Sequence, residues 1–514
     1  MRIDEIVAAS GGTLLRGDAT RRVRSVVFDS RAVTGDSLFV ALRGGHADGH
    51  QFLQHARQRG ATAALVEPGT PVELTDGIQA LIEAPDTRAA LAPVAAAFYR
   101  NPSASLCVIG ITGTDGKTTT SYFVDAVCRA AGMTTGMIGT VGVRVGDESD
   151  QHSSRQTTPE SAEIQRLLAR MRDREVGTAI IESTSHGLAM HRLDNCEFDV
   201  GVVTNVTHEH LDFHGTEAEY RAAKSRLLSF VAQARERGKR GIVVINENDA
   251  GARAIAPAAA GCEVVRFSSR GMTGAAVGAA NHRLAVDGSS FELRVGGDMR
   301  RVGIHLPGGH NIENALAAAA TCHALGIAID TIAAGLASLS SVPGRMERVD
   351  AGQPFTVLVD YAHTPEAIRG ILTEARRVAR GSVLVLFGSA GERDIAKRSL
   401  QGAIATTLAD YAVFTSEDPR FEDPYAVIDE IARGASEAGG ERGVDFDCIE
   451  DRRLAIEHIL DRAGAGDVVV LAGKGHERSM IYLDEFRPWH EAGIARNVLR
   501  ALGYHHDTER RGSD

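Results

Sequence analysis

A buried strand, a glycine-containing loop and a helix follow one another in the second hundred residues of the chain. The apolar run Leu106–Ile111 leads into the loop Gly113–Thr119, and a helical stretch continues from about Thr118 to Ala131. Two further apolar runs, Thr178–Ile181 and Val200–Thr204, have the composition of central strands in a parallel sheet that helices cover on both faces. The sequence therefore predicts a doubly wound α/β domain of the P-loop type around this loop.

The loop has the chemistry of a phosphate site, although it does not fit the common nucleotide-binding pattern. A Walker loop has a glycine five positions before Gly116, where this chain has Ile111. Gly113 and Gly116 still leave room for backbone N–H groups to approach phosphate oxygens. Lys117 supplies a positive charge, and Thr118 offers a hydroxyl to Mg²⁺. We interpret the loop as an ATP site. The residues expected to contact ATP there are Gly113, Thr114, Asp115, Gly116, Lys117, Thr118 and Thr119.

Polar side chains follow the two other apolar runs. Glu182 comes directly after the first run, and His208, His210 and His214 come soon after the second. Ligands of parallel α/β sheets gather at the carboxyl ends of the strands, so a carboxylate and a histidine there can reach Mg²⁺ held by nucleotide phosphates. A lone histidine is usually structural, which is our interpretation of His208 and His214. Glu182 and His210 are the predicted metal ligands, together with Thr118.

A lysine is predicted to lie on the apolar face of the next helix. That helix begins with the capping-box pattern Thr216–Glu219, and Lys224 lies between the apolar positions Tyr220 and Leu227. An inward lysine reaches back to solvent, pairs with an anion or loses its charge, and the first outcome is the commonest. An uncharged Lys224 beside a metal site can instead react with CO₂. The resulting carbamate offers an oxygen ligand to a second cation, and both interpretations stay open.

Two proline-containing breaks divide the chain of 514 residues into three predicted domains. Asn101-Pro-Ser103 ends a small α/β region, and Ser341-Val-Pro-Gly-Arg345 precedes a second alternation of strands and helices. The strands predicted there are Phe355–Asp360, Val383–Phe387, Ala412–Thr415 and Val468–Ala472. The fold class is therefore α/β, with a small N-terminal α/β domain (1–103), a central ATPase domain (104–340) and a C-terminal Rossmann-like domain (341–514).

Composition excludes several functional classes. The net charge of -11 comes from 56 basic and 67 acidic residues spread along the chain, which argues against a nucleic-acid partner. Six separated cysteines form no C-x-x-C pair, so neither a disulfide framework nor a structural zinc site is predicted. The chain begins without a signal-peptide pattern and has no long apolar run. We expect a cytoplasmic monomer without stable membrane insertion.

The motifs taken together resemble those of the Mur ligase family, and the resemblance covers nearly the whole chain. Its central signature is found at Gly113–Thr119, Glu182, Ser185-His-Gly187, His210-Leu-Asp212, Lys224 and His310-Asn-Ile-Glu-Asn314. The catalytic residues that it implies are Lys117, Glu182, His210 and Lys224. It also implies that Asn311 and Asn314 contact the base of ATP. Folylpolyglutamate synthetases share these motifs, so the signature indicates the reaction type and leaves the substrate open.

Motifs in the N-terminal region narrow the resemblance to the family members that add a diamino acid as the third residue of a peptidoglycan precursor. Phe28-Asp-Ser-Arg31 and Gly45-His-Ala-Asp-Gly49 are similar to the uridine-nucleotide-binding domain of those ligases. Thr157-Thr-Pro159 is similar to their contacts with the muramoyl dipeptide. The residues implied to bind UDP-MurNAc-L-Ala-D-Glu are Ser30, Thr157, Thr158, Thr184 and Arg192, where Thr184 replaces the usual serine.

The C-terminal region resembles the same ligases in several loops that follow strands. Nucleotide contacts are implied for Arg345, Asp360 and His363. Contacts with the incoming amino acid are implied for Arg393, Glu417, Asp418, Arg420, Gly473 and Glu477. Loops at the strand ends of one sheet edge can converge on these two ligands.

One motif departs from the family's commonest pattern. Ligases that add meso-diaminopimelate usually have Asp-Asn-Pro-Arg in the loop that recognises the amino acid, whereas this chain has Glu417-Asp-Pro-Arg420. Arg420 can still pair with a carboxylate. An ionised Asp418 would repel the distal carboxylate of diaminopimelate and favour an ammonium, unless Arg420 absorbs its charge. Diaminopimelate and a basic amino acid, lysine or ornithine, are therefore both kept.

The resemblance implies an amide ligase that uses ATP, Mg²⁺ at two sites and CO₂ as the carbamate of Lys224. Its partners would be UDP-MurNAc-L-Ala-D-Glu, ATP and the diamino acid, and the reaction would pass through an acyl phosphate. A folylpolyglutamate-type ligase is one alternative, and the N-terminal motifs oppose it. A metal-dependent hydrolase is suggested by His208 and His210, but such an enzyme has no use for an ATP loop. A non-catalytic ATP-binding relative would be expected to lack Lys117, Glu182 or Lys224, and all three are present.

Overall fold

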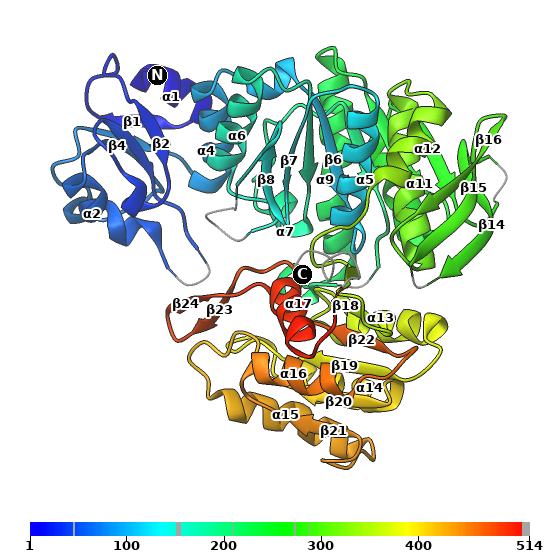
Figure 1. The fold of residues 1–514 in the computed structure, drawn as a ribbon. Coiled ribbons are helices and arrows are strands. Elements are labelled where there is room, and N and C mark those ends of the chain that lie inside the picture. Colours follow the sequence, from blue (N-terminus) through cyan, green and yellow to red (C-terminus); the bar gives the residue numbers. More distant parts are fainter. Residues whose placement is uncertain (45–46, 151–155, 208, 272–273, 286, 506–514) are drawn as a thin grey trace, which may run out of the picture. The chain divides into compact units, whose positions relative to one another are not determined.

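A computed structural model of the protein describes residues 1–44, 47–150, 156–207, 209–271, 274–285 and 287–505. The chain forms two compact units (Figure 1). The first contains residues 1–280, 292–302 and 312–336, and the second contains residues 281–291, 303–311 and 337–514. Within the described residues, no helix combines the length and the apolar character needed to cross a membrane.

The N-terminal part of the first unit is a five-stranded sheet. Its order is β1 (Thr13–Arg16), β5 (Ala80–Glu83), β4 (Ala61–Val66), β3 (Ser37–Val40) and β2 (Ser25–Val27), and only the β1–β5 pair is antiparallel. Its α-helices are α1 (Ile3–Ser10), α2 (Leu53–Gln58), α3 (Val72–Thr75) and α4 (Thr87–Phe98). Alternate residues of β3 belong to two different apolar clusters, so both faces of the sheet are buried.

The phosphate loop follows the central strand of a second sheet. This strand, β6 (Cys107–Thr112), lies between β10 (Thr178–Glu182) and β11 (Val200–Val203), and all three are parallel. Their carboxyl ends therefore lie at one edge, which confirms the predicted arrangement of the loop, Glu182 and the segment after β11.

The second sheet is longer than the sequence predicts. Its order is β16 (Asp298–Ile304), β15 (Gly288–Val295), β14 (Val277–Ala285), β13 (Glu263–Ser268), β12 (Ile242–Asn246), β11, β6, β10, β7 (Thr135–Gly139), β8 (Gly142–Val145) and β9 (Glu148–Asp150). Strands β8 and β9 are antiparallel additions. The α-helices of this region are α5 (Lys117–Ala130), α6 (Ser161–Asp173), α7 (Ser185–Ala189), α8 (Leu211–His214), α9 (Glu217–Glu236), α10 (Ala250–Ile255), α11 (Gly309–Ala324) and α12 (Ile329–Ser338).

Helix α9 packs closely against β6 because β6 contains a glycine at the contact. A Cβ atom on Gly110 would lie 2.6 Å from Leu227 and 2.8 Å from Phe198. The helix begins with the predicted capping box of Thr216 and Glu219. Its apolar face is buried as expected, and this close packing carries Lys224, one turn before Leu227, to the end of β6.

The C-terminal part of the second unit is a six-stranded sheet with helices on both faces (Figure 1). The order is β17 (Glu347–Val349), β18 (Thr356–Val359), β22 (Val468–Leu471), β19 (Val383–Phe387), β20 (Tyr411–Phe414) and β21 (Phe446–Cys448), and only β17 is antiparallel. The helices are α13 (Pro365–Val378), α14 (Ala396–Leu408), α15 (Pro424–Glu437), α16 (Arg452–Arg462) and α17 (Glu491–Ala501). A hairpin of β23 (Ser479–Tyr482) and β24 (Glu485–Pro488) follows β22. The predicted Rossmann-like alternation is confirmed.

Candidate active site

The phosphate loop needs its two glycines because neighbouring side chains lie against it. A Cβ atom on Gly113 would lie 1.9 Å from Thr204 Oγ1. Gly116 has the left-handed backbone angle φ = 82°, and its Cβ atom would lie 2.2 Å from Asn314 Oδ1. Asn314 therefore lies beside the loop, and its predicted contact with the base of ATP stays a prediction. The Asn311 side chain donates a hydrogen bond of 2.7 Å to the carbonyl oxygen of Pro307.

The segment after β11 fixes the conformation of the loop. The Asn205 side chain accepts a hydrogen bond from the Asp115 backbone N–H at 2.9 Å and donates one to the Asp115 carbonyl oxygen at 3.2 Å. Thr204 Oγ1 donates to the same carbonyl oxygen at 2.6 Å. The Thr114 hydroxyl lies 2.9 Å from the hydroxyl of Tyr220 on α9. Thr114 and Asp115 thus shape the loop, which leaves other N–H groups of the loop for a ligand.

Two lysines meet at the carbonyl oxygen of Gly113. Lys117 Nζ donates to it at 2.8 Å and to the Thr114 carbonyl oxygen at 2.7 Å, and Lys224 Nζ donates to it at 2.6 Å. Lys224 is only 2 % exposed, so it does not reach back to solvent. Burial, with a smaller contribution from the charge of Lys117, holds the pKa of Lys224 well below its ordinary value. Burial thus favours the neutral amine of Lys224, the state that reaction with CO₂ requires.

Glu182 and Thr118 form the predicted pair, and a third residue joins them. Thr118 Oγ1 and Thr140 Oγ1 each donate a hydrogen bond of 2.8 Å to Glu182 Oε2, and the Thr140 backbone N–H donates to Oε1 at 2.9 Å. The carboxylate is 1 % exposed. The Thr140 hydroxyl also lies 3.1 Å from that of Thr157. Carboxylate and hydroxyl oxygens are the ligands that Mg²⁺ prefers, so this group fits a magnesium site at the helix α5 N-terminus.

His210 lies in an aromatic cluster beside the site. Its ring centroid is 4.6 Å from that of His186, and Nε2 lies 3.6 Å from a carboxylate oxygen of Glu209. The rings of Phe213 and His214 also lie against His186. Across the residues that the structure places, no three or more His, Cys, Asp or Glu side chains gather closely enough to hold a metal ion. The role of His210 as a metal ligand stays a prediction. His208 lies outside the described residues.

Residues predicted to bind the dipeptide surround the end of β10. Thr158 Oγ1 donates to the Glu182 carbonyl oxygen at 2.7 Å and accepts from the Thr184 backbone N–H at 3.1 Å. Thr184 Oγ1 accepts from the Gly187 N–H and thereby caps α7. Arg192 Nη1 donates to the Thr158 carbonyl oxygen at 3.0 Å. Four of the five predicted residues are thus brought together. The fourth, Thr157, joins the group through the contact of its hydroxyl with Thr140, which is bonded to Glu182.

The fifth residue, Ser30, lies in the N-terminal sheet region. Its hydroxyl is buried and lies 2.9 Å from His55 Nδ1. Asp29 caps the same short helical turn and also pairs with the Arg31 guanidinium. Part of the similar motif at residues 45–49 lies outside the described residues, so its structure is not compared with the prediction.

The residues predicted to bind nucleotide in the second unit lie in two segments: Arg345 precedes β17, and Asp360 and His363 lie in the loop between β18 and α13. Asp360 accepts hydrogen bonds of 2.8 Å from the backbone N–H groups of Met346 and Ala362, and burial raises the pKa of its carboxyl group. The Arg345 guanidinium lies 5.2 Å from the ring centroid of Tyr361. His363 Nδ1 is 2.9 Å from the Tyr361 carbonyl oxygen. These contacts order the loop, and nucleotide binding by its residues stays a prediction.

The amino-acid loop corrects one expectation from the sequence. Asp418 Oδ1 accepts hydrogen bonds from Lys474 Nζ at 2.8 Å and from the Ile481 backbone N–H at 2.9 Å. Lys474 is fully buried and also pairs with Glu477. The ion-pair partner of Asp418 is therefore Lys474, and not Arg420 as the sequence suggested. The Arg420 backbone instead pairs with Ile481 and Leu483 on the β23 side. Arg393 is exposed.

Glu417 is a buried carboxyl group in the same loop. Its Oε2 atom has no hydrogen-bond partner among the described residues, and a Cβ atom on Gly473 would lie 2.6 Å from it. Burial, opposed by Lys474, Lys397 and Arg452 and assisted by Glu477, raises the pKa of Glu417 to about 7. Glu417 thus changes charge near neutral pH, at a position that Gly473 leaves open.

Sequence reasoning missed three residues of these sites. Thr140 follows β7, a short strand that was not predicted, and Asn205 follows β11 shortly before the predicted His210. Lys474 is the neighbour of the predicted Gly473. Each one acts through a contact with a residue far away in the sequence, so a polar residue directly after a strand was the only signal.

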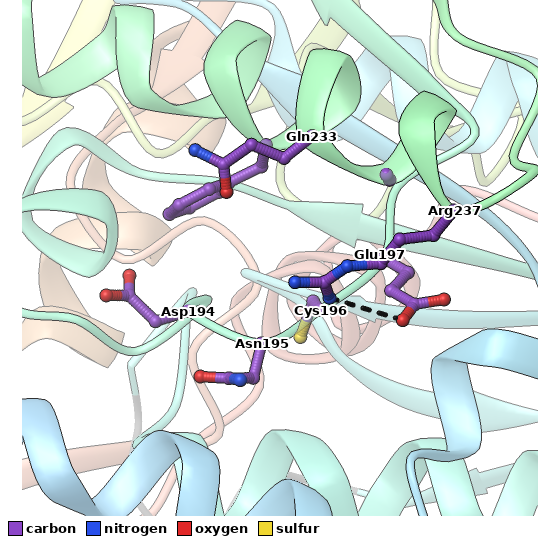
Figure 2. A pocket seen from close by; sticks show the side chains of 8 residues that line it. Asp194, Asn195, Cys196, Glu197, Gln233 and Arg237 are labelled. Atoms are coloured by element: carbon purple, nitrogen blue, oxygen red, sulfur yellow. Dashed lines mark hydrogen bonds and ion pairs between the residues drawn. The ribbon is translucent and has the colours of Figure 1, made fainter. Parts of the chain in front are cut away.

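A pocket with a volume of about 160 Å³ lies apart from these residues (Figure 2). It is formed by the segment that enters β11 and by the last turns of α9, whereas the phosphate loop is held by residues that follow β11. Glu197 and Arg237 pair across it at 3.4 Å. Its lining residues are Asp194, Asn195, Cys196, Glu197, Phe230, Gln233, Ala234 and Arg237.

Three Mur ligase family models match successive parts of the chain. Residues 22–99 match the Mur ligase family catalytic domain, residues 111–322 the Mur ligase middle domain, and residues 344–475 the Mur ligase glutamate ligase domain. The chain is 44% identical over 491 residues to a UDP-N-acetylmuramyl-tripeptide synthetase of Roseiflexus sp. (strain RS-1), covering 94% of this chain and 95% of that protein.

Two further relatives agree with this match. A UDP-N-acetylmuramoyl-L-alanyl-D-glutamate--2,6-diaminopimelate ligase of Geobacillus kaustophilus is 38% identical over 475 residues, or 92% of this chain and 94% of that protein. A solved structure of a ligase with the same name has a TM-score of 0.66 and 26% identity, covering 98% of this chain and 99% of that one. The chain belongs to the Mur ligase family.

Proposed function

We propose that this protein uses ATP to join a diamino acid, 2,6-diaminopimelate, to the side-chain carboxylate of D-Glu in UDP-MurNAc-L-Ala-D-Glu. The observation that carries the proposal is the phosphate loop itself, where Lys117 and Lys224 meet at Gly113 beside the Glu182–Thr118 pair. Relatives named as tripeptide synthetases and diaminopimelate ligases support the substrate. The ion pair of Asp418 with Lys474, which Lys474 shares with Glu477, weakens the objection to diaminopimelate that the sequence raised.

The reaction divides into two transfers. The γ-phosphoryl group of ATP passes to the D-Glu carboxylate and gives an acyl phosphate, and the amine of the diamino acid then attacks the acyl carbon. The tetrahedral intermediate collapses to an amide and phosphate. Lys117 and the loop N–H groups bind the β and γ phosphates and neutralise their charge as it moves. The protein supplies charge and positioning, so the chemistry requires no covalent nucleophile.

The oxygen atoms at the end of β10 fit Mg²⁺. Thr118 and Glu182 would hold one ion, which shields phosphate charge during transfer when it is bound. His210 and a carbamate on Lys224 would hold a second. The Lys224 carbamate keeps one N–H group, so it can still donate to the Gly113 carbonyl oxygen that the amine contacts at 2.6 Å.

Phosphate release tests the proposal directly. Purified protein with ATP, Mg²⁺ and UDP-MurNAc-L-Ala-D-Glu is expected to release phosphate when diaminopimelate is added, and little when lysine or ornithine replaces it. Mass spectrometry of the product should show the tripeptide. Absence of release with all three amino acids would refute the ligase reaction, whereas release with lysine alone would refute only the choice of diamino acid.

Gly139 tests the position of the Glu182 carboxylate. A methyl group at Gly139 would lie 2.1 Å from Glu182 Oε1, so Gly139→Ala must push the carboxylate away from Thr118 and Thr140. We expect the KM for ATP at fixed Mg²⁺ to rise about tenfold, the scale of an overpacked core site. Gly35→Ala is the control, because nothing lies within 4 Å of that position. Equal KM values for the two variants would contradict this placement of the metal ligands.

The raised pKa of Glu417 predicts that the KM for the diamino acid depends on pH. Its pKa of about 7 is raised, so the negative charge is present above pH 7 and is lost as the pH falls through 7. The ammonium groups of the substrate stay charged in this range, so we expect the KM for diaminopimelate to rise by up to about tenfold between pH 8 and pH 6. Glu417→Gln should have a flat profile over this range, and exposed Glu485→Gln should follow the wild type. A pH-dependent KM in Glu417→Gln would assign the titration to another group.

A further inference from the structure

A buried cluster of three charged side chains connects the N-terminal part of the first unit with the dipeptide residues. Arg88 on α4 donates from Nη1 to Glu160 Oε1 at 2.7 Å, and Arg192 donates from Nε to the same oxygen at 3.1 Å. Glu160 and Arg192 are 8 % and 7 % exposed. Arg88 is also anchored by a hydrogen bond of 3.0 Å from Nη2 to the Arg43 carbonyl oxygen. One carboxylate therefore serves two guanidinium groups.

The cluster has an uncompensated positive charge. Glu160 and Arg88 are the charged groups that act on Arg192, the first favouring its charged form and the second opposing it, while burial lowers the pKa of Arg192. A buried excess charge is unfavourable unless a counter-charge arrives. Arg192 donates through Nε to Glu160 and through Nη1 to Thr158, and its Nη2 atom lies 3.1 Å from Glu160 Oε1 and 3.5 Å from the Met190 sulfur, so the second N–H group of Nη1 can serve an anionic ligand.

The cluster is also joined to the active-site strand. The Thr158 carbonyl oxygen accepts from Arg192, and the Thr158 hydroxyl donates to the Glu182 carbonyl oxygen at the end of β10. Thr158 thus connects Arg192 directly with Glu182, the predicted Mg²⁺ ligand.

We propose that Arg88 is a specificity-determining residue of the dipeptide site. By sharing Glu160 with Arg192, it keeps the cluster positive and tightens binding of the α-carboxylate of D-Glu in the muramoyl dipeptide. The inference rests on the proposed function, since it takes the dipeptide as the anion that Arg192 meets. Without Arg88, Glu160 would neutralise Arg192 fully, and the attraction for a carboxylate would fall.

Calorimetric titration with UDP-MurNAc-L-Ala-D-Glu tests the proposal without requiring turnover. Arg88→Gln is expected to raise the Kd about tenfold, and Arg88→Lys, which keeps the charge, to stay within about threefold of wild type. Arg88→Gln combined with Glu160→Gln restores a single positive charge, so it should bind more tightly than Arg88→Gln alone. Arg166→Gln on α6 is the control, because its pair with Glu163 is exposed on the arginine side.

A change in the ligand distinguishes an electrostatic role of Arg88 from a role in supporting the fold. With the analogue whose free D-Glu α-carboxylate is an amide, wild type and Arg88→Gln should bind equally, because the neutral amide does not sense the lost charge. An equal loss of affinity for the acid and the amide, or a further loss in the double variant, would mean that Arg88 only supports the fold and would overturn the proposal. If wild type binds the acid without releasing phosphate, the ligase function fails while this charge effect is still measured. If wild type does not bind the acid, both are refuted.

Discussion

Replacing Lys224 with alanine is expected to lower the rate of amide formation by roughly 10² to 10³, the scale of losing one electrostatic contact in a transition state. Lys224 is buried, has a depressed pKa and lies 2.6 Å from the Gly113 carbonyl oxygen. A neutral amine in this place adds no positive charge to the phosphate site. A carbamate would add oxygen ligands, and the variant loses them.

Added small molecules identify which form of Lys224 acts. Formate or acetate should partly restore activity to Lys224→Ala, because either one can return a carboxylate to the space of the carbamate. Methylamine should not restore it. Rescue by methylamine and not by carboxylates would show that the amine itself acts and would remove the carbamate from the mechanism. Carbon-13 NMR of wild-type protein under labelled CO₂ should show a carbamate signal that is absent from Lys224→Ala.

Replacing Arg452 with leucine is expected to lower the free energy of unfolding by about 3 to 5 kcal/mol, because it leaves a buried carboxylate without its partner. Arg452 and Glu491 are both fully buried, and Nη2 lies 2.6 Å from Glu491 Oε1. Arg452 also donates to the carbonyl oxygens of Ser416 and Ala472, at 3.2 Å and 2.6 Å. It therefore holds together the strand ends that carry Glu417 and Gly473.

Chemical denaturation of both variants measures this effect. Arg487→Leu is the matched control, because Arg487 and Glu485 form an exposed pair that contributes little to stability. The double variant Arg452→Leu with Glu491→Leu should recover part of the loss, since it buries no lone charge. A change of less than about 1 kcal/mol in Arg452→Leu would mean that water reaches Glu491 when the arginine is absent.

Sequence patterns predicted the fold wherever they were repeated or local. The apolar runs gave β6, β10 and β11 within one or two residues, and Val383–Phe387 matches β19 at both ends. The short antiparallel strands β8 and β9 escaped for different reasons. Strand β9 is an exposed edge strand of three residues, and β8 has only four residues, of which Val143 and Val145 are buried. Local turn chemistry was equally reliable, as the capping box of Thr216 shows.

The active-site residues divide in the same way. Lys117, Glu182 and Lys224 were predictable because a loop, a strand end and a helix face each place one of them. Thr140, Lys474 and Arg88 were not, because each has its role through a hydrogen bond to a residue between 42 and 72 positions away. Sequence neighbours alone did not identify the ion-pair partner of Asp418, which is Lys474 and not the nearby Arg420.

The sequence by itself determined the class of each domain and the phosphate loop, because these depend on local backbone geometry and on periodic burial. Its motifs indicated the reaction type only through their resemblance to a known family. Only the tertiary structure decided which charges balance one another. Burial depresses the pKa of Lys224, Lys474 pairs with Asp418 and Glu477, and Glu160 pairs with both Arg88 and Arg192. These outcomes depend on desolvation and on distances of a few ångströms between distant segments, which no local pattern contains.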